Sequence, residues 1–461
     1  MGAIAGWARE QFGAVQLGDR RRDERFLLMV STANRNPRGR ISEAFRRGAE
    51  RQAAYDFLEN EAIPAASVIR AVSVGTARQC SRLEEVLVPF DGSSLSLTDR
   101  CDEKDFGSVG ARSKGSRGLK VISALALLPT GAPIGVLSQE WWARTEVAPK
   151  KSKRRALEER ESHRWHEALQ VATAAMEAEA PTCRRHALID REGDASLLMQ
   201  ALKHQGWDFT IRANATRKVL ENDKRISVRT VLKRAPKGCC TVTLPGRNGQ
   251  EGREAVLTVS YAMVDLVMRD RHTHKREVMR VGAVWAREVG KRKPIDWMLY
   301  TTAEVRTLSD ALDTVQRYTN RWQVEEFHRA WKRGHCEVEE TQLRSKEGVV
   351  KWASILAVVA ARAEKLKYAS RQTPDVSAAE HLSATEIEAI MLLKQQEKRK
   401  NETIGDEVPS LALAVRWLAD LGGYIGKWNG PPGATVIGRG LERIRPVELA
   451  IKSLRDAGKM R

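Results

Sequence analysis

The chain has 461 residues, which is too long for one ordinary domain and predicts two to four compact units. Its 42% hydrophobic residues are enough for real cores and exclude global disorder. Because 78 Lys and Arg face 59 Asp and Glu, the formal net charge is +19. This surplus predicts a polyanionic partner, with nucleic acid as the first candidate and an anionic membrane as the second. There is no run of about 18 apolar residues and no secretion signal, so we expect a cytoplasmic protein.

The cysteines and histidines carry no metal-binding pattern. None of the six cysteines forms a C-x-x-C pair, and the adjacent Cys239 and Cys240 are badly placed to chelate one ion together. We therefore expect reduced thiols rather than a disulfide framework or a zinc site. The nine histidines are interpreted as structural or surface residues.

Residues 1–75 are predicted to be helical, because Ala44–Leu58 carries apolar residues at helical spacing. The positive charge of this segment is all arginine, and the first lysine of the chain is Lys104. Three of the arginines are consecutive: Arg20, Arg21 and Arg22. Arginine binds phosphates and guanine edges with two hydrogen bonds at once, so a DNA-binding unit is one interpretation. A solvated charged surface is the other, because acidic residues nearly balance the segment.

A strand pattern begins near Glu84, where apolar residues alternate, and we expect this strand to end at Asp91-Gly92. Two further strand-like runs, Leu119–Leu128 and Ile134–Trp142, are separated by turn residues and predict a hairpin. A basic cluster at 150–155 leads into a predicted helix over about 156–178.

A short buried strand, His186–Ile189, then terminates at Asp190, and Trp207–Arg212 follows as another strand. Residues 215–300 alternate Val, Thr, Arg and Lys in short runs broken by Gly and Pro, which predicts a β-rich insert.

The C-terminal third is predicted to be helical. Leu308 to about Cys336 is typical of one long helix, and Val349–Tyr368 of another. Residues 370–408 are charged and partly linker-like, and 409–461 form a helical tail interrupted by Gly-Gly and Pro-Pro.

Asp91 and Asp190 each follow a strand-like run, where the backbone is rigid and the side chain meets solvent. Two-metal phosphoryl transfer needs two or three converging carboxylates that hold divalent ions, and oxygen ligands suit Mg²⁺ or Mn²⁺. An aspartate that closes a strand is, however, commonly a turn former. Asp190 also has two acidic neighbours, Glu192 and Asp194.

The helix around Glu325 places several polar groups on one face. At about 100° per residue, Tyr318, Arg321, Glu325 and Lys332 fall within an arc of roughly 60°. Glu326 is rotated by about 100° and leaves this face. The arrangement singles out one acid beside groups that can bind phosphate, although an amphipathic helix with a solvated charged face has the same pattern.

The run Tyr318, Arg321, Glu325, Lys332 resembles the Y-R-E-K signature of DDE transposases similar to the Tn-five transposase, in the IS-four insertion-sequence group. The segments around Asp91 and Asp190 resemble those that carry the family's two catalytic aspartates. Leu17–Arg22 and Ala53–Leu58 resemble its N-terminal DNA-binding domain, and Val415–Tyr424 its C-terminal domain. Gly92 and Ser93 depart from the hydroxyl-bearing pair expected after the first aspartate.

The resemblance implies an α/β fold: a helical DNA-binding domain (1–75), an RNase H-like catalytic core (76–370) with the insert at about 215–300, and a linker with a helical dimerisation domain (371–461). It implies cut-and-paste transposition, in which Mg²⁺, or Mn²⁺ in its place, supports cleavage of double-stranded DNA at transposon ends, a hairpin intermediate and strand transfer by a synaptic homodimer. The implied catalytic and metal-binding residues are Asp91, Asp190 and Glu325. The implied DNA contacts, besides the arginines of the N-terminal domain, are Tyr318, Arg321, Lys332, Trp297 and Arg212.

Two alternatives remain open from the sequence. One is a non-catalytic DNA-binding relic or regulator with the same fold. The other is a different RNase H-like nuclease, which would cut DNA without joining it. The recognised end sequence and the target preference do not follow from the resemblance.

Overall fold

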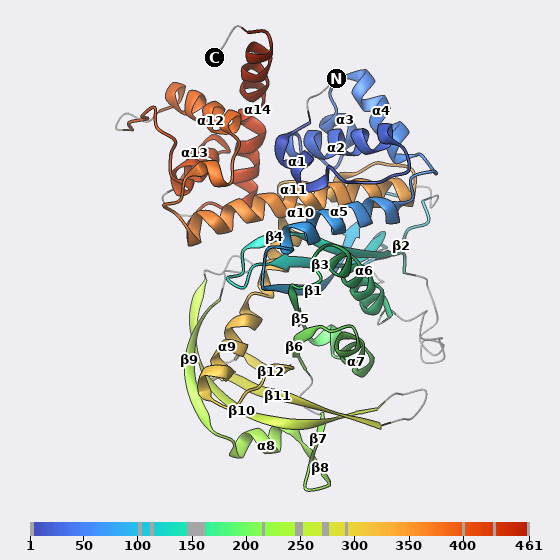
Figure 1. Cartoon of the computed structure of the whole chain (residues 1–461), viewed down its shortest axis with the longest axis vertical. Coiled ribbons are helices and arrows are strands. Elements are labelled where there is room, and N and C mark those ends of the chain that lie inside the picture. The colour runs from blue at the N-terminus through green and yellow to red at the C-terminus, as the bar shows by residue number, and fades with distance from the viewer. Residues whose placement is uncertain are drawn as a thin grey trace.

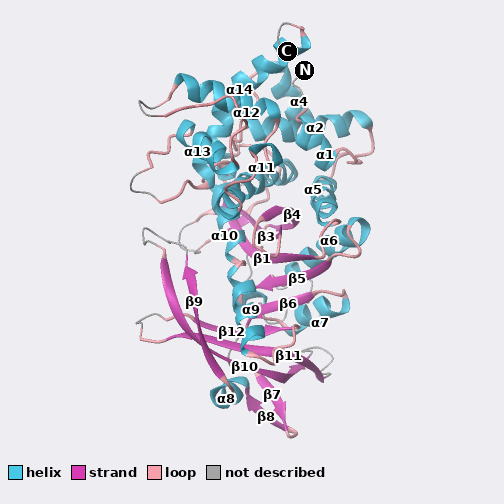
Figure 2. Cartoon of the chain, turned by 60° about the vertical axis from the view of Figure 1, so that its left-hand side comes forward, coloured by secondary structure: helices cyan, strands magenta, loops and turns pink. Residues whose placement is uncertain are grey.

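The computed structural model describes residues 4–99, 104–110, 115–144, 161, 163–213, 217–244, 252–269, 276–290, 294–398, 402–426 and 430–458. Within these ranges twelve strands form one mixed sheet, in the order β2-β3-β1-β5-β6-β12-β11-β10-β7-β8, with β4 on β3 and β9 on β10. Most helices gather at one end of the molecule and most strands at the other (Figures 1 and 2). The predicted basic cluster at 150–155 lies outside the described residues.

The centre of the sheet combines an antiparallel and a parallel part. β1 (Glu85–Ser96), β3 (Arg117–Leu127) and β4 (Pro133–Trp142) are antiparallel, while β5 (Arg184–Ile189) and β6 (Asp208–Arg212) continue from β1 as parallel neighbours. The short β2 (Gly107–Ser108) pairs antiparallel with β3 at the end of the strand order. Because both faces are covered, alternate residues of β1 enter two different cores.

Val86, Val88 and Phe90 pack with α6 (His163–Glu179) and α7 (Ser196–His204) on one face of the sheet. Leu87 lies on the other face, in the core that contains α10 (Trp322–Lys332) and α11 (Lys346–Gln372). Side chains alternate along a strand, so Asp91 projects to the same face as Leu87, toward α10.

The expectation that the first strand ends at Asp91 is wrong. β1 loses its parallel partner after the pair Phe90↔Ile189, but its antiparallel pairing with β3 continues from Asp91↔Ser123 to Ser96↔Gly118. The apolar alternation stops at residue 90 because the strand leaves the two-sided core there, whereas its backbone pairing does not stop. Gly118 adopts φ +158°, and a side chain on it would meet the carbonyl oxygen of Leu95.

The predicted β-rich insert is present and extends the core sheet. β10 (Arg253–Arg269) and β11 (Arg276–Glu288) form a long antiparallel ladder that curves across one end of the molecule (Figure 1). β12 (Asp296–Thr301) joins β11 to β6 and so connects the insert to the core. The remaining elements are β7 (Lys218–Glu221), β8 (Lys224–Ser227), α8 (Val228–Arg234) and β9 (Lys237–Leu244).

The single helix expected from Leu308 to Cys336 is wrong, because the structure divides it into α9 (Leu308–Thr319) and α10. The two residues between them, Asn320 and Arg321, keep helical dihedral angles. Their hydrogen bonds, however, connect residues three apart: Arg321 N–H donates to the Tyr318 carbonyl at 3.1 Å. Both side chains are engaged elsewhere, Asn320 with the Pro129 carbonyl and Arg321 with Asp91.

The N-terminal helices pack on α11, which runs through the middle of the helical end (Figure 1). They are α1 (Gly6–Phe12), α2 (Arg20–Arg35), α3 (Ile41–Ala44), α4 (Gly48–Leu58) and α5 (Ala65–Cys80). The indole N–H of buried Trp352 donates to the Gly39 carbonyl at 2.9 Å, and the buried Lys351 ammonium donates to the Leu58 carbonyl at 2.9 Å. The predicted domain boundary at residue 75 falls inside α5, which lies against β4.

The linker-like character expected for part of 370–408 is corrected by α12 (Ala384–Gln396), which begins with a capping box formed by Ser383 and Glu386. Its charged residues face partners: buried Lys394 lies 3.0 Å from Glu402. α13 (Leu411–Leu421) and α14 (Ala434–Asp456) complete the C-terminal part. None of the helices in the described residues combines the length and apolar character needed to cross a membrane.

Candidate active site

Asp91 and Asp190 come together at the edge where two parallel strands diverge. The last register pair of β1 and β5 is Phe90↔Ile189, and the next residue of each strand is an aspartate. Both flanking residues are buried and fix the two strand ends. The aspartates are therefore neighbours on the face that meets α10.

Asp190 lies in a crowded acidic environment. It caps the short 3₁₀ helix η3 (Arg191–Gly193), and its Oδ1 accepts a hydrogen bond from Glu192 N–H at 2.8 Å. Burial raises the pKa of Asp190, and the negative charge of Asp91 adds to this, while the Glu192 N–H, Arg321 and Arg212 act in the opposite direction. The pKa of Glu192 is also raised, by burial and then by Asp190 and Asp91.

Arg321 connects Glu325 to this pair. Its Nη2 lies 2.6 Å from Glu325 Oε1, and its Nη1 lies 3.5 Å from Asp91 Oδ1. Only 10% of the Arg321 side chain is exposed. Burial lowers the pKa of this guanidinium, but Tyr318, Asp91 and Glu325 around it outweigh burial and raise it overall. The first turn of α10 thereby carries Glu325 to the side of the two aspartates.

The predicted DNA contacts Tyr318, Trp297 and Arg212 lie beside Arg321. The rings of Trp297 and Tyr318 meet edge to face at 5.3 Å, and the Arg321 guanidinium lies 5.9 Å from the Tyr318 ring centre. Tyr318 is almost fully buried, while Trp297 is only partly buried. Arg212 Nη2 donates to the Asp296 carbonyl at 3.3 Å. The cluster forms one wall next to the carboxylates.

Lys332 lies apart from the acids, at the far end of β1. Its Nζ is 3.6 Å from Glu339 Oε1, and the same carboxylate oxygen accepts from Ser96 N–H at 2.9 Å. Lys332 lines an open cavity of about 650 Å³ together with Arg333 and Arg40. Four glutamates also line this cavity, so its acidic side chains outnumber its cations: Glu43, Glu337, Glu339 and Glu340.

The three consecutive arginines of α2 lie outside the candidate active site. Arg20 is 90% exposed and pairs with Glu24 at 3.1 Å, and Arg21 is also exposed. Arg22 instead donates to the Ala62 carbonyl at 3.2 Å, so its guanidinium connects α2 to the segment before α5. DNA contact by these arginines stays a prediction.

His328 was missed by the sequence reasoning, which treated the histidines as structural. Its Nδ1 lies 3.5 Å from Asp91 Oδ2, and its ring lies against Phe327 and Trp331. The signal was present, since position 328 is one helical turn after Glu325 and shares its face. The contact itself depends on how α10 crosses β1, which the sequence pattern does not show.

The three acids offer an all-oxygen donor set that suits Mg²⁺ or Mn²⁺. Within the described residues, no group of three or more His, Cys, Asp or Glu side chains is placed to hold a metal ion, and Arg321 lies between Asp91 and Glu325. Burial and the charge of Asp91 raise the pKa of Asp190, and a bound cation would act in the opposite direction.

Two protein-family models match this chain. One, described as Transposase DNA-binding, matches residues 4–63, and the other, described as Transposase DDE domain, matches residues 166–361. Both models describe domains of transposases, and together they support the resemblance to DDE transposases. The DDE match contains Asp190 and Glu325, whereas Asp91 precedes it. A DDE domain implies an RNase H-like core, in agreement with the mixed sheet, and such domains generally depend on a divalent metal. The DNA-binding match supports DNA as the partner of α1 to α4.

Proposed function

We propose that this protein catalyses cut-and-paste DNA transposition: it cuts double-stranded DNA at transposon ends through a hairpin intermediate and joins the freed 3′ end to target DNA. The observation that carries the proposal is the convergence of Asp91, Asp190 and Glu325 around Arg321, from two strands and a helix that are far apart in the sequence. The two transposase matches, which cover α1 to α4 and the chain from α6 into α11, support the same reaction class.

In this proposal, Asp91, Asp190 and Glu325 hold the divalent ions, which supply activation of the attacking oxygen and stabilisation of the leaving oxygen when bound. Arg321 orients Glu325 and offers its remaining N–H groups to a DNA phosphate. The partly buried indole of Trp297, beside Tyr318, offers a stacking surface to a base extruded at the hairpin. Lys332 binds a DNA phosphate, as the resemblance implies.

The other parts of the chain are assigned to end recognition and assembly. The arginines of α1 to α4 bind the transposon end, with Arg20 and Arg21 exposed at the start of α2. The C-terminal helices contribute to a homodimer that brings two ends together, in line with the resemblance of Val415–Tyr424. A homodimer also explains how two ends are cut in a coordinated way.

A paired-end assay tests the proposal. Purified protein is mixed with DNA that carries the inverted ends of its own element, in Mg²⁺, Mn²⁺ or EDTA. We expect hairpin-ended and joined products that require metal. Glu325→Gln should bind DNA without cutting it. Glu326→Gln is the matched control, because the Glu326 carboxylate points to Arg329 at 2.8 Å and Lys367 at 3.3 Å, away from Asp91.

Each outcome separates the candidate functions. If Glu325→Gln cuts as well as the unchanged protein, the assignment of the site is wrong. Binding without products under every divalent ion supports a non-catalytic DNA-binding protein. Cuts without joints support a plain nuclease of the same fold.

A further inference from the structure

The carboxylate of Glu339 connects the end of strand β1 to the end of helix α10. It lies in the short 3₁₀ helix η4 (Val338–Glu340), which follows α10. Its Oε1 accepts a hydrogen bond from the Ser96 N–H at 2.9 Å and lies 3.6 Å from Lys332 Nζ. Its Oε2 accepts from Arg333 Nε at 2.7 Å. Only 9% of the Glu339 side chain is exposed, so one largely buried carboxylate joins both elements.

The contact with Ser96 takes the place of a missing strand. β5 pairs with β1 only as far as Phe90, so in the described part of the chain no strand covers that edge of β1 beyond this residue. Backbone N–H groups alternate in direction along a strand, and the next one, from Leu97, donates to the Arg117 carbonyl on the β3 side. The Ser96 N–H therefore points to the open edge, where Glu339 accepts from it.

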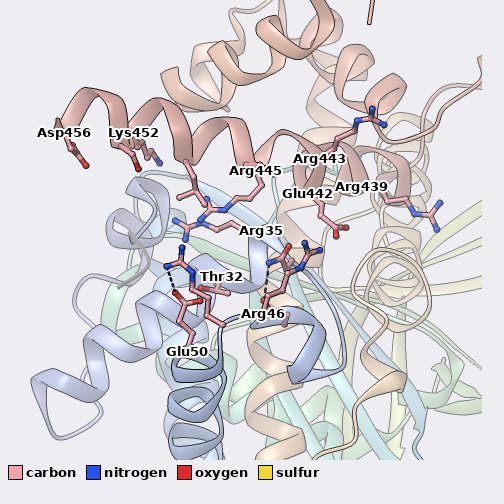
Figure 3. Close-up of a pocket in the computed structure, with 16 residues that line it drawn as sticks. Thr32, Arg35, Arg46, Glu50, Arg439, Glu442, Arg443, Arg445, Lys452 and Asp456 are labelled. Atoms are coloured by element: carbon pink, nitrogen blue, oxygen red, sulfur yellow. Dashed lines mark hydrogen bonds and ion pairs between the residues drawn. The ribbon is translucent and has the colours of Figure 1, made fainter. Parts of the chain in front are cut away.

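The turn that presents Glu339 has an unusual backbone conformation that other segments enforce. Glu337, immediately before η4, has φ +48° and ψ +41°, which a residue with a side chain seldom adopts unless its surroundings require it. A side chain on Gly39 would collide with the Glu337 carbonyl, and Arg38 contacts the Glu337 carboxylate at 3.4 Å. Arg38 also lies 3.0 Å from Glu442, which points from α14 toward the N-terminal helices (Figure 3). Segments near both ends of the chain therefore fix the position of η4.

Polar contacts connect β1 and α10 at two places, and the acids lie at only one of them. Ser96 is five residues from Asp91, about 17 Å along β1, and Lys332 is seven residues from Glu325, about 10 Å along α10. The apolar packing between the two places is not directional and tolerates small changes of angle. A polar contact far from the acids therefore restricts the angle at which the helix crosses the strand, and with it the distance between Asp91 and Glu325.

We propose that Glu339 is a positioning residue of the acidic site, which holds β1 against α10 so that Asp91 and Glu325 can bind the same divalent ion. The inference rests on the proposed function, which assigns these acids to the metal. Because the Glu339 carboxylate also offsets part of the charge of Lys332, its removal should act in opposite directions. Metal binding should weaken, while the attraction of Lys332 for a DNA phosphate should increase. A residue that only stabilises the fold would not have these opposite effects.

Calorimetric titration with Mn²⁺ in the absence of DNA tests this role without a cleavage step. The full-length protein and its variants are compared well below their unfolding temperatures, and Glu325→Gln identifies the binding that belongs to the acids. We expect Glu339→Ala to bind Mn²⁺ about tenfold or more weakly. Glu339→Gln should lie between Glu339→Ala and the unchanged protein, because its amide oxygen can still accept from the Ser96 N–H. Glu340→Gln is the matched control from the same turn, since its side chain is 58% exposed and pairs with Arg40.

Affinity for a duplex that carries the element's end, measured in EDTA, gives the second readout. It should be unchanged or higher in Glu339→Ala, while kcat for cleavage falls. If Glu339→Ala does not fold, Glu339→Gln replaces it in both measurements.

The proposal is overturned if the Glu339 variants bind Mn²⁺ as the unchanged protein does. It is also overturned if they lose DNA affinity but keep Mn²⁺ affinity, which would mean that Glu339 acts on Lys332 alone. Mn²⁺ binding that does not depend on Glu325 would overturn both this inference and the proposed function. Mn²⁺ binding that depends on Glu325 and Glu339, without DNA cleavage, would support the inference and contradict only the proposed reaction.

Discussion

Replacing Arg321 tests whether this side chain is the counterion of the candidate metal site. Its guanidinium lies 2.6 Å from Glu325 and 3.5 Å from Asp91. Its positive charge also acts to lower the pKa of Asp190. In Arg321→Gln three carboxylates would face one another with much less positive charge between them. Removing one partner of a fully buried ion pair costs about 3–5 kcal/mol. Because 15% of Asp91 and 22% of Glu325 remain exposed, we expect a smaller loss, of about 2 kcal/mol.

Thermal unfolding in EDTA and in Mg²⁺ measures this effect. A loss of about 2 kcal/mol corresponds to a decrease of roughly 4–8 °C for a unit of 150–250 residues. Mg²⁺ at about 100 times its Kd raises the free energy of unfolding by about 2.7 kcal/mol if only the folded protein binds it. The gain with Mg²⁺ should be larger in Arg321→Gln than in the unchanged protein, where a cation must compete with the guanidinium. Arg321→Lys, which keeps the charge without the planar fork, should lie between the two.

Two results would refute this reasoning. One is an unfolding temperature of Arg321→Gln in EDTA equal to that of the unchanged protein, which would mean that the carboxylates do not need the guanidinium. The other is the same Mg²⁺-induced rise in both proteins, which would mean that the ion binds away from Asp91 and Glu325. A surface pair such as Arg20 and Glu24 is the control, because Arg20→Gln should leave both temperatures unchanged.

Three further predictions concern other parts of the chain. His328 Nδ1 lies 3.5 Å from Asp91 Oδ2, so we expect His328→Ala to slow DNA cleavage by about 10- to 100-fold with DNA binding retained. Equal cleavage rates would show that His328 does not position Asp91. Glu140→Gln should raise the unfolding temperature at pH 8 and have less effect at pH 5. Burial, with Glu167, raises the pKa of Glu140 to about 7, so the ionised Glu140 destabilises the fold increasingly as pH rises from about 4.5 to 7. A change in unfolding temperature that does not depend on pH would contradict this explanation. Affinity for duplex DNA should fall by about 10³-fold or more between 50 and 200 mM salt if six or more phosphates are contacted, and flat binding would exclude a phosphate-dominated interface.

The resemblance named Asp91, Asp190 and Glu325, and each of them also has a local pattern that a turn former or a solvated helix face would share. Asp91 and Asp190 each follow a run of buried strand residues, and helical spacing alone separates Glu325 from Glu326. The insert was also visible, since its alternation has the period of strands. These features depend on a few consecutive residues, so they are visible in the sequence alone.

The remaining features depend on contacts between distant segments. β1 continues past Asp91 only because β3 pairs with it, and α9 separates from α10 where Asn320 and Arg321 turn toward Pro129 and Asp91. The place of His328 beside Asp91 follows from the crossing of α10 over β1. No periodicity in either segment carries that information, so the sequence could name the acids without showing what balances their charge.

The acidic site gathers like charges around one counterion, because Asp91, Asp190 and Glu325 share Arg321. A protein selected for stability alone would have little reason to bury like charges around one counterion, because apolar groups of similar size fill such space at lower free-energy cost. A buried site whose net charge the protein does not neutralise can bind a ligand of the opposite charge. The pattern therefore points to a divalent cation at the acidic site beside α10, which should stabilise the fold when it binds.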